Sequence, residues 1–156
     1  MIKSIMFVCH GNICRSPMAE FIMKDLVKNE CPDTELFIAS SATSTEEIGN
    51  PVYPPARAEL SRRGVPCGGR QAVQVKKSDY GKYDLFLVMD GNNVRNIMRI
   101  FGSDPDGKVR RLSEFSGGNE DISDPWYSGR FDLAFDDIYR GCVGLLEHIR
   151  RENRQV

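Results

Sequence analysis

The sequence lacks the features that mark membrane, secreted and nucleic-acid-binding proteins. No apolar run is long enough to span a bilayer, and the apolar stretch near the N-terminus has the length of a strand and no small-residue cleavage site. The formal net charge is only -1, so no overall basic field favours nucleic acid or an anionic membrane. We therefore expect no signal peptide, no membrane association and no nucleic-acid partner.

Cysteine is present without a pattern. The five cysteines are an odd number at irregular spacing, and no C-x-x-C pair occurs among them. This argues against a disulfide framework and gives little support to a zinc site. Free thiols are typical of a reducing compartment, so we expect a cytoplasmic protein.

The hydrophobic pattern predicts an α/β fold in a single domain over residues 1–156. Unbroken apolar runs at 5–8 and 85–89 suit strands that helices cover on both faces, and we expect strands at 3–8 and 84–89. Weaker candidates lie at 36–39 and 108–112. Apolar residues at helical spacing alternate with these strands, at 18–27, 56–60, 94–101 and 131–149.

This alternation predicts an open, doubly wound parallel sheet, in which ligands bind beyond the carboxyl ends of the strands. Cys9 stands at that end of the first strand. Pro54 or Pro55 is expected to begin the second helix, and Asp90 or Asn92 to cap the third. The segment 113–130, rich in glycine and proline, is expected to be a long functional loop.

The most informative segment is VCHGNICRSP, in which Cys9 and Arg15 enclose five residues. The bare spacing is a weak signal, but here it follows a predicted buried strand and precedes a predicted helix. A loop that curls between strand and helix can direct its N–H groups and the helix N-terminus at an anion. Gly11 and Asn12 tolerate the positive φ that such a curl needs.

The side chains of this segment fit phosphoryl transfer. Arg15 has a planar fork that matches two phosphate oxygens. A helix N-terminus and a nearby cation favour the thiolate form of cysteine, and Ser16 can donate its hydroxyl to that thiolate. Cys9 is therefore expected to attack phosphorus and form a phosphocysteine. The alternative is a buried structural cysteine beside a surface arginine.

With these residues in view, the chain resembles the low-molecular-weight protein tyrosine phosphatases over nearly its whole length. The N-terminal CHGNICRSPMAE and the DPWY motif that includes Asp124 carry the resemblance, with MDGNN at 89–93 and RQ at 70–71 as weaker landmarks. The resemblance implies a four-stranded parallel sheet of the phosphotyrosine protein phosphatase I type, with no metal and no cofactor. It also implies a phosphate-binding loop that includes His10, Gly11, Asn12, Ile13, Cys14 and Ser16.

The resemblance further implies that Cys9 is the nucleophile, Arg15 the phosphate-binding residue and Asp124 the general acid. A tyrosine leaves more easily when its oxygen is protonated, so the chemistry independently calls for such a carboxyl group. From sequence alone, Asp124 also fits a turn aspartate before proline. Trp126 and Tyr127 are expected either to form an aromatic wall of the substrate cleft or to pack their loop onto the domain.

The chain departs from its relatives at two places. Many of them have an aromatic residue after the second strand, where this chain has Glu46 and Glu47. These acids either favour basic or small substrates, with Glu46 in the cleft, or are simply solvated. Relatives often have a histidine shortly before the landmark arginine, here Arg70. Without it, the hydrogen-bond network behind the loop is expected to differ or to be incomplete.

Further expectations concern redox chemistry and specificity. The resemblance suggests a reversible disulfide between Cys9 and Cys14 that protects the nucleophile, although Cys14 also fits simple packing. Ile13 stands where arginine phosphatases tend to carry threonine, which favours phosphotyrosine. The expected partner is a phosphotyrosine-containing protein or an aryl phosphate, bound by a monomer or weak dimer. An arsenate reductase, an arginine phosphatase and a phosphoprotein-binding module remain as alternatives.

Overall fold

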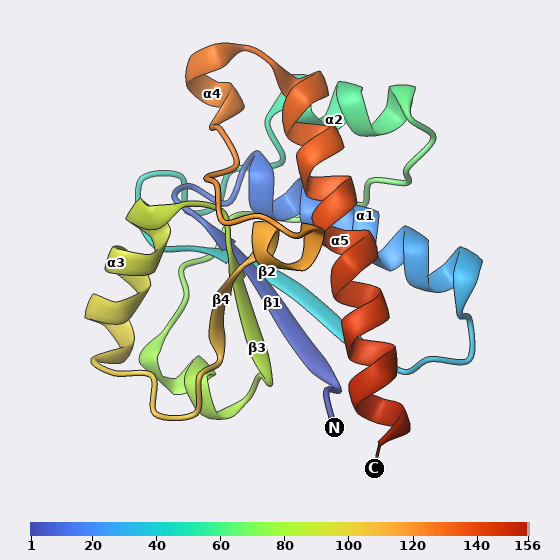
Figure 1. Ribbon diagram of the computed structural model, residues 1–156. Helices are drawn as coiled ribbons and strands as arrows, with labels where there is room; N and C mark the ends of the chain where they lie inside the picture. Colours follow the sequence, from blue (N-terminus) through green and yellow to red (C-terminus); the bar gives the residue numbers. More distant parts are fainter. Residues whose placement is uncertain (156) are drawn as a thin grey trace.

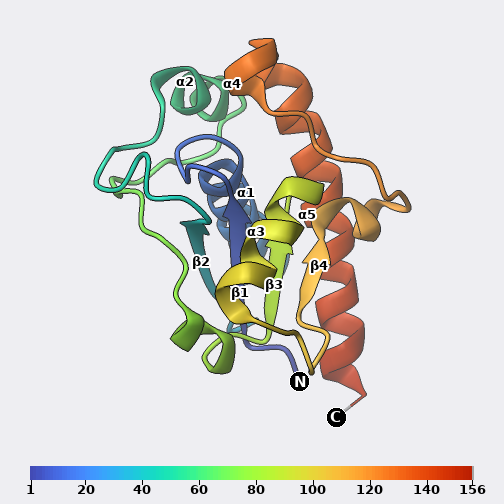
Figure 2. The same cartoon turned by 90° about the vertical axis from the view of Figure 1, so that its left-hand side faces the viewer.

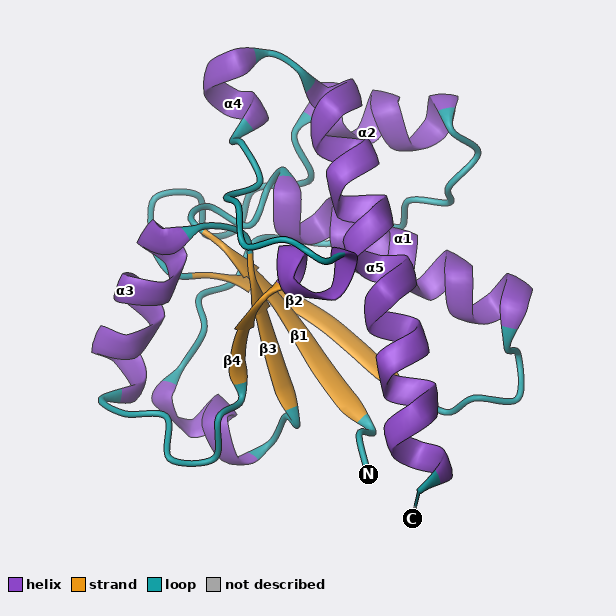
Figure 3. Ribbon diagram, in the orientation of Figure 1, coloured by secondary structure: helices purple, strands orange, loops and turns teal. Residues whose placement is uncertain are grey.

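Four parallel strands form the centre of the molecule, and helices cover both of their faces (Figures 1 and 3). The computed structural model describes residues 1–155, and no helix in that range is both long and apolar enough to cross a membrane. The strand order is β2-β1-β3-β4, which confirms the predicted doubly wound α/β sheet. The strands are β1 (Ser4–Cys9), β2 (Phe37–Ala42), β3 (Leu85–Val88) and β4 (Val109–Arg111).

The predicted helices are also present, in most cases longer than their apolar stripes. Pro54 begins the second helix and the Asp90 side chain caps the third, as expected. The α-helices are α1 (Arg15–Glu30), α2 (Pro54–Arg62), α3 (Gly91–Phe101), α4 (Pro125–Ser128) and α5 (Phe131–Arg154). Two 3-10 helices, η1 (Lys77–Gly81) and η2 (Leu112–Ser116), complete the elements.

The side chains of β1 alternate between two apolar clusters, one on each face of the sheet. Ile5 and Phe7 pack in a cluster with α1, α2 and α5, whereas Met6 and Val8 pack in a second cluster with α3. Figure 2 shows α3 in front of the strands and α1 behind them. Burial on both faces explains why the strand reads as an unbroken apolar run.

The strand β2 continues beyond the predicted end at residue 39. Its last residues include Ser40 and Ser41, which are polar but almost completely buried. They lie beside the last residues of β1, since Ser41 is in register with Val8. The Ser40 hydroxyl accepts from Asn12 in the loop after β1, whereas the Ser41 hydroxyl donates to Met6 Sδ, so the loop after β1 explains the first of these buried serines.

The prediction of one long loop over 113–130 is wrong, because η2 and α4 lie within or across this segment. The 3-10 helix packs closely on α5 at two glycines. A Cβ atom on Gly144 would lie 1.8 Å from the Phe115 carbonyl oxygen, and one on Gly141 would lie 2.6 Å from Leu112 Cγ. The missing side chains therefore let α5 hold η2, from which the chain returns to the carboxyl end of the sheet.

Candidate active site

The loop between β1 and α1 wraps around the sulfur of Cys9. The Asn12 N–H donates to Cys9 Sγ at 3.3 Å, and Ser16 Oγ lies 3.0 Å from the same sulfur. Asn12 adopts a positive φ of 60°, as its residue type permits. Gly11 does not adopt a positive φ, so that part of the prediction is wrong. A Cβ on Gly11 would meet Glu47 Cγ at 3.4 Å, an ordinary van der Waals contact, so Gly11 lies against the neighbouring loop.

A pocket of about 110 Å³ opens over this loop. Although Cys9 is only 3% exposed, it lines the pocket, so the sulfur is not sealed away. Asn12 and Ser16 do not line the pocket. Both are completely buried behind its wall, where they contact the sulfur of Cys9. The lining brings together most of the predicted site residues and adds Glu47: Cys9, His10, Gly11, Ile13, Cys14, Arg15, Glu46, Asp124, Trp126 and Tyr127.

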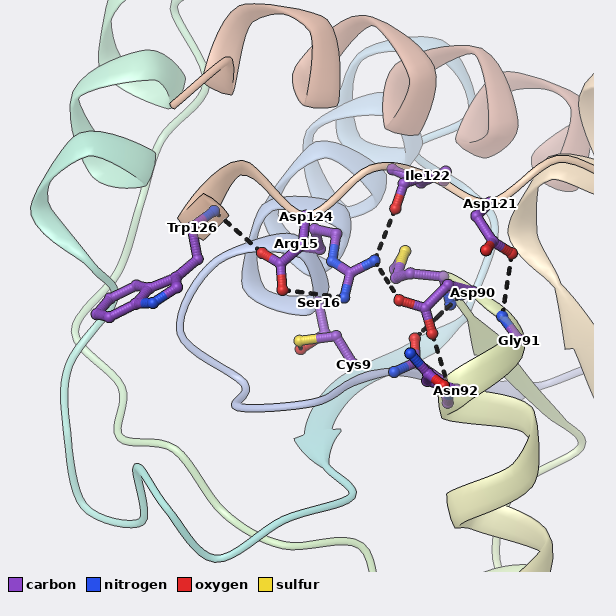
Figure 4. A network of polar contacts seen from close by, with 12 residues as sticks. Cys9, Arg15, Ser16, Asp90, Gly91, Asn92, Asp121, Ile122, Asp124 and Trp126 are labelled. Carbon is purple, nitrogen blue, oxygen red and sulfur yellow. Dashed lines mark hydrogen bonds and ion pairs between the residues drawn. The ribbon is translucent and has the colours of Figure 1, made fainter. Parts of the chain in front are cut away.

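The guanidinium group of Arg15 is held from two other parts of the chain. Its Nη1 donates to Asp90 Oδ2 at 2.8 Å and to the Ile122 carbonyl at 2.7 Å, and its Nη2 lies 3.5 Å from Asp124 Oδ2 (Figure 4). Burial lowers the pKa of Arg15, but the negative charges of Cys9 and the two aspartates outweigh it, so the pKa lies above its ordinary value. The cation therefore stays charged and oriented.

Asp90 is a site residue that the sequence predicts only as a helix cap. Its Oδ1 accepts from the Asn93 N–H at 2.8 Å and so caps α3, while its Oδ2 binds Arg15. One carboxylate thus fixes both the start of α3 and the guanidinium group of Arg15. The available signal was its position two residues after the end of β3, because neighbouring parallel strands end at the same edge of the sheet.

Asp124 faces the guanidinium group from the loop before α4. Its Oδ1 accepts from the Trp126 N–H at 3.0 Å, which leaves Oδ2 towards Arg15 (Figure 4). The side chain is 26% exposed and lines the pocket. Asp121 lies elsewhere, accepting from the Gly91 N–H at 3.0 Å and from Arg111 Nη1 at 2.9 Å. Between the two, Ile122 anchors the loop by donating its N–H to the Met89 carbonyl at 2.9 Å.

An aromatic side chain that was not predicted supports the pocket wall. The ring centroids of Tyr53 and Trp126 lie 4.7 Å apart, and the two ring planes are tilted by 51°. The backbone N–H of Tyr53 donates to the Ile13 carbonyl at 2.9 Å. Tyr53 therefore joins the phosphate loop to the loop of Asp124. Trp126 and Tyr127 are 49% and 85% exposed, so both offer free ring surface at the pocket.

The comparison with known proteins agrees with this geometry. The family model described as low molecular weight phosphotyrosine protein phosphatase matches residues 4–155. The chain belongs to this family. Membership confirms the resemblance and the prediction of an enzyme, a hydrolase of the low molecular weight phosphotyrosine protein phosphatase type.

Similar members come from distant organisms. The low molecular weight protein-tyrosine-phosphatase YfkJ of Bacillus subtilis is 33% identical over 153 residues, covering 97% of this chain and 98% of that protein. The Gallus gallus phosphatase is 37% identical over 145 residues, covering 91% and 90%. The crystal structure of YfkJ matches with a TM-score of 0.92 over 97% of each chain, at 32% identity. The structure of the drosophila arginine phosphatase DARP matches at 0.85 and 25% identity, over 96% and 98%.

Two acids form one side of the pocket in this phosphatase. Glu46 Oε2 lies 2.7 Å from His10 Nε2, and Glu47 Oε2 accepts from Asn50 Nδ2 at 2.5 Å. His10 thus directs its ring to Glu46 at the rim. Both carboxylates line the pocket beside the two exposed aromatic rings, so the mouth of the pocket combines negative charge with apolar surface.

All five cysteines of the phosphatase are free thiols. Cys14 lines the pocket with Cys9, and burial together with the charge of Cys9 raises the pKa of the Cys14 thiol. The proposed disulfide between these two residues stays a prediction. Cys142 is completely buried on α5, and Cys67 is partly buried beside Arg57, which fits structural roles for both.

The hydrogen-bond network behind the phosphate loop is complete. Asn12 Nδ2 donates to Ser16 Oγ at 2.8 Å and to Ser40 Oγ at 3.0 Å. Asn12 Oδ1 accepts from Arg70 Nη2 and from the Val73 N–H at 3.2 Å. Every hydrogen-bonding position of this buried amide therefore has a partner, and Arg70 is one of these partners.

Proposed function

We propose that this phosphatase hydrolyses phosphotyrosine in proteins, or related aryl phosphates, through a phosphocysteine intermediate. The observation that carries the proposal is the convergence of Cys9 and Arg15, from the loop between β1 and α1, and of Asp124, from the distant loop before α4, on one pocket. A thiolate, a charged planar donor and a carboxyl group are the three groups that this reaction needs.

In the first step, the Cys9 thiolate attacks phosphorus as the bond between phosphorus and the tyrosine oxygen breaks. The carboxylic acid of Asp124 gives its proton to the departing oxygen, so tyrosine leaves neutral and Asp124 becomes a carboxylate. Arg15 binds two of the phosphoryl oxygens with its fork. Its bonds to Asp90 and Ile122 support this role, because they hold the guanidinium group before substrate arrives.

In the second step, water takes the place of tyrosine. The Asp124 carboxylate removes a proton from that water, the resulting hydroxide attacks phosphorus, and the phosphorus–sulfur bond breaks. Phosphate leaves, the Cys9 thiolate is restored and Asp124 is again protonated. One carboxyl group therefore serves as acid and then as base, and no external reagent other than water is consumed.

The pocket wall supports an aromatic substrate. The rings of Trp126 and Tyr127 offer flat apolar surface next to the phosphate site, against which a phenyl ring can stack. Ile13 adds apolar surface within the loop itself. The structural likeness to an arginine phosphatase makes phosphoarginine the competing substrate, and Ile13 favours phosphotyrosine over it.

Arsenate reduction is the weaker alternative. That chemistry needs further thiols to carry a disulfide from the pocket to the surface. Cys142 is completely buried among apolar residues of α5, and Cys67 lies against Arg57 and is absent from the pocket lining. Neither thiol is placed to relay a disulfide from Cys9.

The test compares wild type, Cys9→Ser and Asp124→Asn on p-nitrophenyl phosphate and on phosphotyrosine, phosphoarginine and phosphoserine peptides, without added metal. Cys9→Ser should abolish turnover while inorganic phosphate still binds. Asp124→Asn should slow phosphotyrosine by roughly 10²- to 10⁴-fold and p-nitrophenyl phosphate by less, because nitrophenolate leaves without a proton. Turnover by Cys9→Ser, or equal losses on both substrates in Asp124→Asn, would contradict the mechanism.

A further inference from the structure

Arg70 reaches the back of the phosphate loop from a distant part of the chain. Its Nη1 donates to the Asn12 backbone carbonyl at 3.2 Å, and its Nη2 donates to Asn12 Oδ1. The arginine side chain is only 14% exposed, and its Nε lies 3.5 Å from the carboxylate of Glu20 on α1. One buried cation thus holds both oxygens of the single residue with a left-handed backbone in this loop.

The direction of these hydrogen bonds is fixed by chemistry. Arginine has donors and no acceptor, so the Asn12 oxygen must face Arg70 and the Asn12 NH₂ group must face the other way. Glu20 acts at the other end of the amide. Its carboxylate accepts from Ser40 Oγ at 2.5 Å, so the Ser40 hydroxyl uses its proton there and must accept from Asn12. Arg70 and Glu20 together therefore determine the orientation of the Asn12 amide, with its oxygen towards Arg70 and its NH₂ group towards Ser40.

The orientation of the Asn12 amide also determines how Ser16 contacts the proposed nucleophile, Cys9. The Asn12 NH₂ group donates to Ser16 Oγ at 2.8 Å, which occupies a lone pair of the hydroxyl. The single Ser16 proton is then free for an acceptor, and Cys9 Sγ at 3.0 Å is nearer than the Ser41 carbonyl at 3.4 Å. A hydroxyl proton aimed at sulfur stabilises a thiolate and does nothing comparable for a thiol.

We propose that Arg70, with Glu20 as its counter-ion, is a positioning residue that directs the hydrogen-bond chain through Asn12 and Ser16 so that it donates to the Cys9 thiolate. Burial lowers the pKa of Arg70, while the negative charges of Glu20 and Cys9 oppose that shift. Arg70 touches neither the pocket lining nor the reacting atoms, so its action passes through Asn12. The inference rests on the proposed role of Cys9.

The test uses the full chain with Arg70→Met, which removes the charge and all donors, and Arg70→Lys, which keeps a charged donor without an acceptor. Arg63→Met is the matched control, because Arg63 is also ion-paired and packs over the Phe135 ring but lies outside the pocket lining. Alkylation by iodoacetate is followed from pH 5 to 9, with the modified thiol located by peptide mass analysis. Turnover of p-nitrophenyl phosphate is measured on the same samples.

Arg70→Met should slow alkylation of Cys9 at pH 6 by roughly tenfold to a hundredfold, the range expected for one hydrogen bond to a charged group. The difference should shrink towards pH 9, where the thiolate forms without that help. Turnover at pH 6 should fall in parallel, and Arg70→Lys should recover most of both rates. The other titratable groups that line the pocket are unchanged in these variants: His10, Cys14, Arg15, Glu46, Glu47, Asp124 and Tyr127.

A merely structural role predicts a different outcome. In that case the alkylation rate and turnover would fall by the same factor at every pH, in proportion to the fall in melting temperature, and Arg70→Lys would not restore them. That result would overturn the inference. If Arg70→Met does not fold, Arg70→Met with Glu20→Gln also removes the carboxylate, which would otherwise keep only its 2.6 Å ion pair with Lys24, and the same comparison applies. Wild-type turnover that depends on Cys9, with Arg70→Met equal to wild type, refutes the inference alone. Turnover that does not depend on Cys9 refutes the proposed function itself.

Discussion

The pair between Arg15 and Asp90 predicts an unusual coupling between stability and anion binding. The Asp90→Asn substitution removes one negative charge but keeps a side-chain oxygen, and asparagine caps helices about as well as aspartate, so α3 should keep its cap. The Arg15 guanidinium then remains buried with Asp124 as its nearest carboxylate, 3.5 Å away. An uncompensated buried charge destabilises the free enzyme.

The structure sets the magnitude of this effect. Two unit charges 2.8 Å apart attract by about 6 kcal/mol at an effective dielectric constant of roughly 20. The Ile122 carbonyl, Asp124 and water in the pocket offset most of that loss, so the free energy of unfolding should fall by about 2 kcal/mol, below the ~3–5 kcal/mol usual for breaking a buried pair. For a chain of this size, that is a fall in Tm of about 4–8 °C.

Inorganic phosphate should reverse part of the loss. Without the repulsion from Asp90, a bound anion gains more from Arg15, and we expect phosphate to bind roughly tenfold more tightly, which is ~1.4 kcal/mol. Thermal melts at increasing phosphate should therefore show a larger upward shift for Asp90→Asn than for wild type. Turnover should not rise with this affinity, because tighter binding of the ground state does not speed the chemical step.

The control for Asp90→Asn is Asp136→Asn, which breaks an exposed pair with Arg63 at 3.0 Å. That change should alter stability by less than about 1 kcal/mol and leave the response to phosphate unchanged. The reasoning is refuted if Asp90→Asn melts with wild type in phosphate-free buffer, or if phosphate raises both melting temperatures equally.

Three further predictions address packing and pH. Tyr53→Leu removes the ring that packs 4.7 Å from the single tryptophan, and the KM for aryl phosphates should rise by about 2- to 10-fold with little change in phosphate affinity, measured by steady-state kinetics. Gly144→Ala places a Cβ 1.8 Å from the Phe115 oxygen and should lower the free energy of unfolding by about 3 kcal/mol or more in urea, whereas a neutral result would show that η2 can move away. A hydrogen bond from Arg130 lowers the pKa of Asp132 to about 2, so this carboxylate stabilises the fold above its unfolded pKa of about 4 and the contribution disappears as the pH falls towards 2. Wild type and Asp132→Asn should differ in Tm at pH 5 and converge near pH 2, and a constant difference would contradict the assignment.

The elements that could be predicted from the sequence are those with strong local patterns. The strands β1 and β3 are continuous apolar runs, and α5 has a long apolar stripe, so their positions follow from burial alone. The loop after β1 was also predictable, because residue types with a known preference for anions and for turns lie next to each other. The catalytic assignment of Asp124 needed the family resemblance, since an aspartate before proline is common in turns.

Other features depend on contacts between distant residues and leave little trace in local sequence. Asp90 pairs with a residue 75 positions away, and Arg70 contacts one 58 positions away. The place of Asp90 after β3 and the two-residue landmark that includes Arg70 mark these positions, but neither signal identifies the partner residue. The elements η2 and α4 were missed for a related reason. Glycines in this segment indicate a loop, but the packing of η2 depends on the glycines of α5, far along the chain.

The anchoring of Ile122 has a consequence for how this scaffold could be redesigned. A single residue, Ser123, separates the Ile122 carbonyl that holds the guanidinium group from Asp124, the proposed general acid. An insertion between Ile122 and Asp124 would move the carbonyl away from the carboxyl group, so the length of this connection is fixed. The turn at 44–50 supplies the rim acids from outside this connection, and new sequences grafted there could change which molecules enter while the reacting groups keep their spacing.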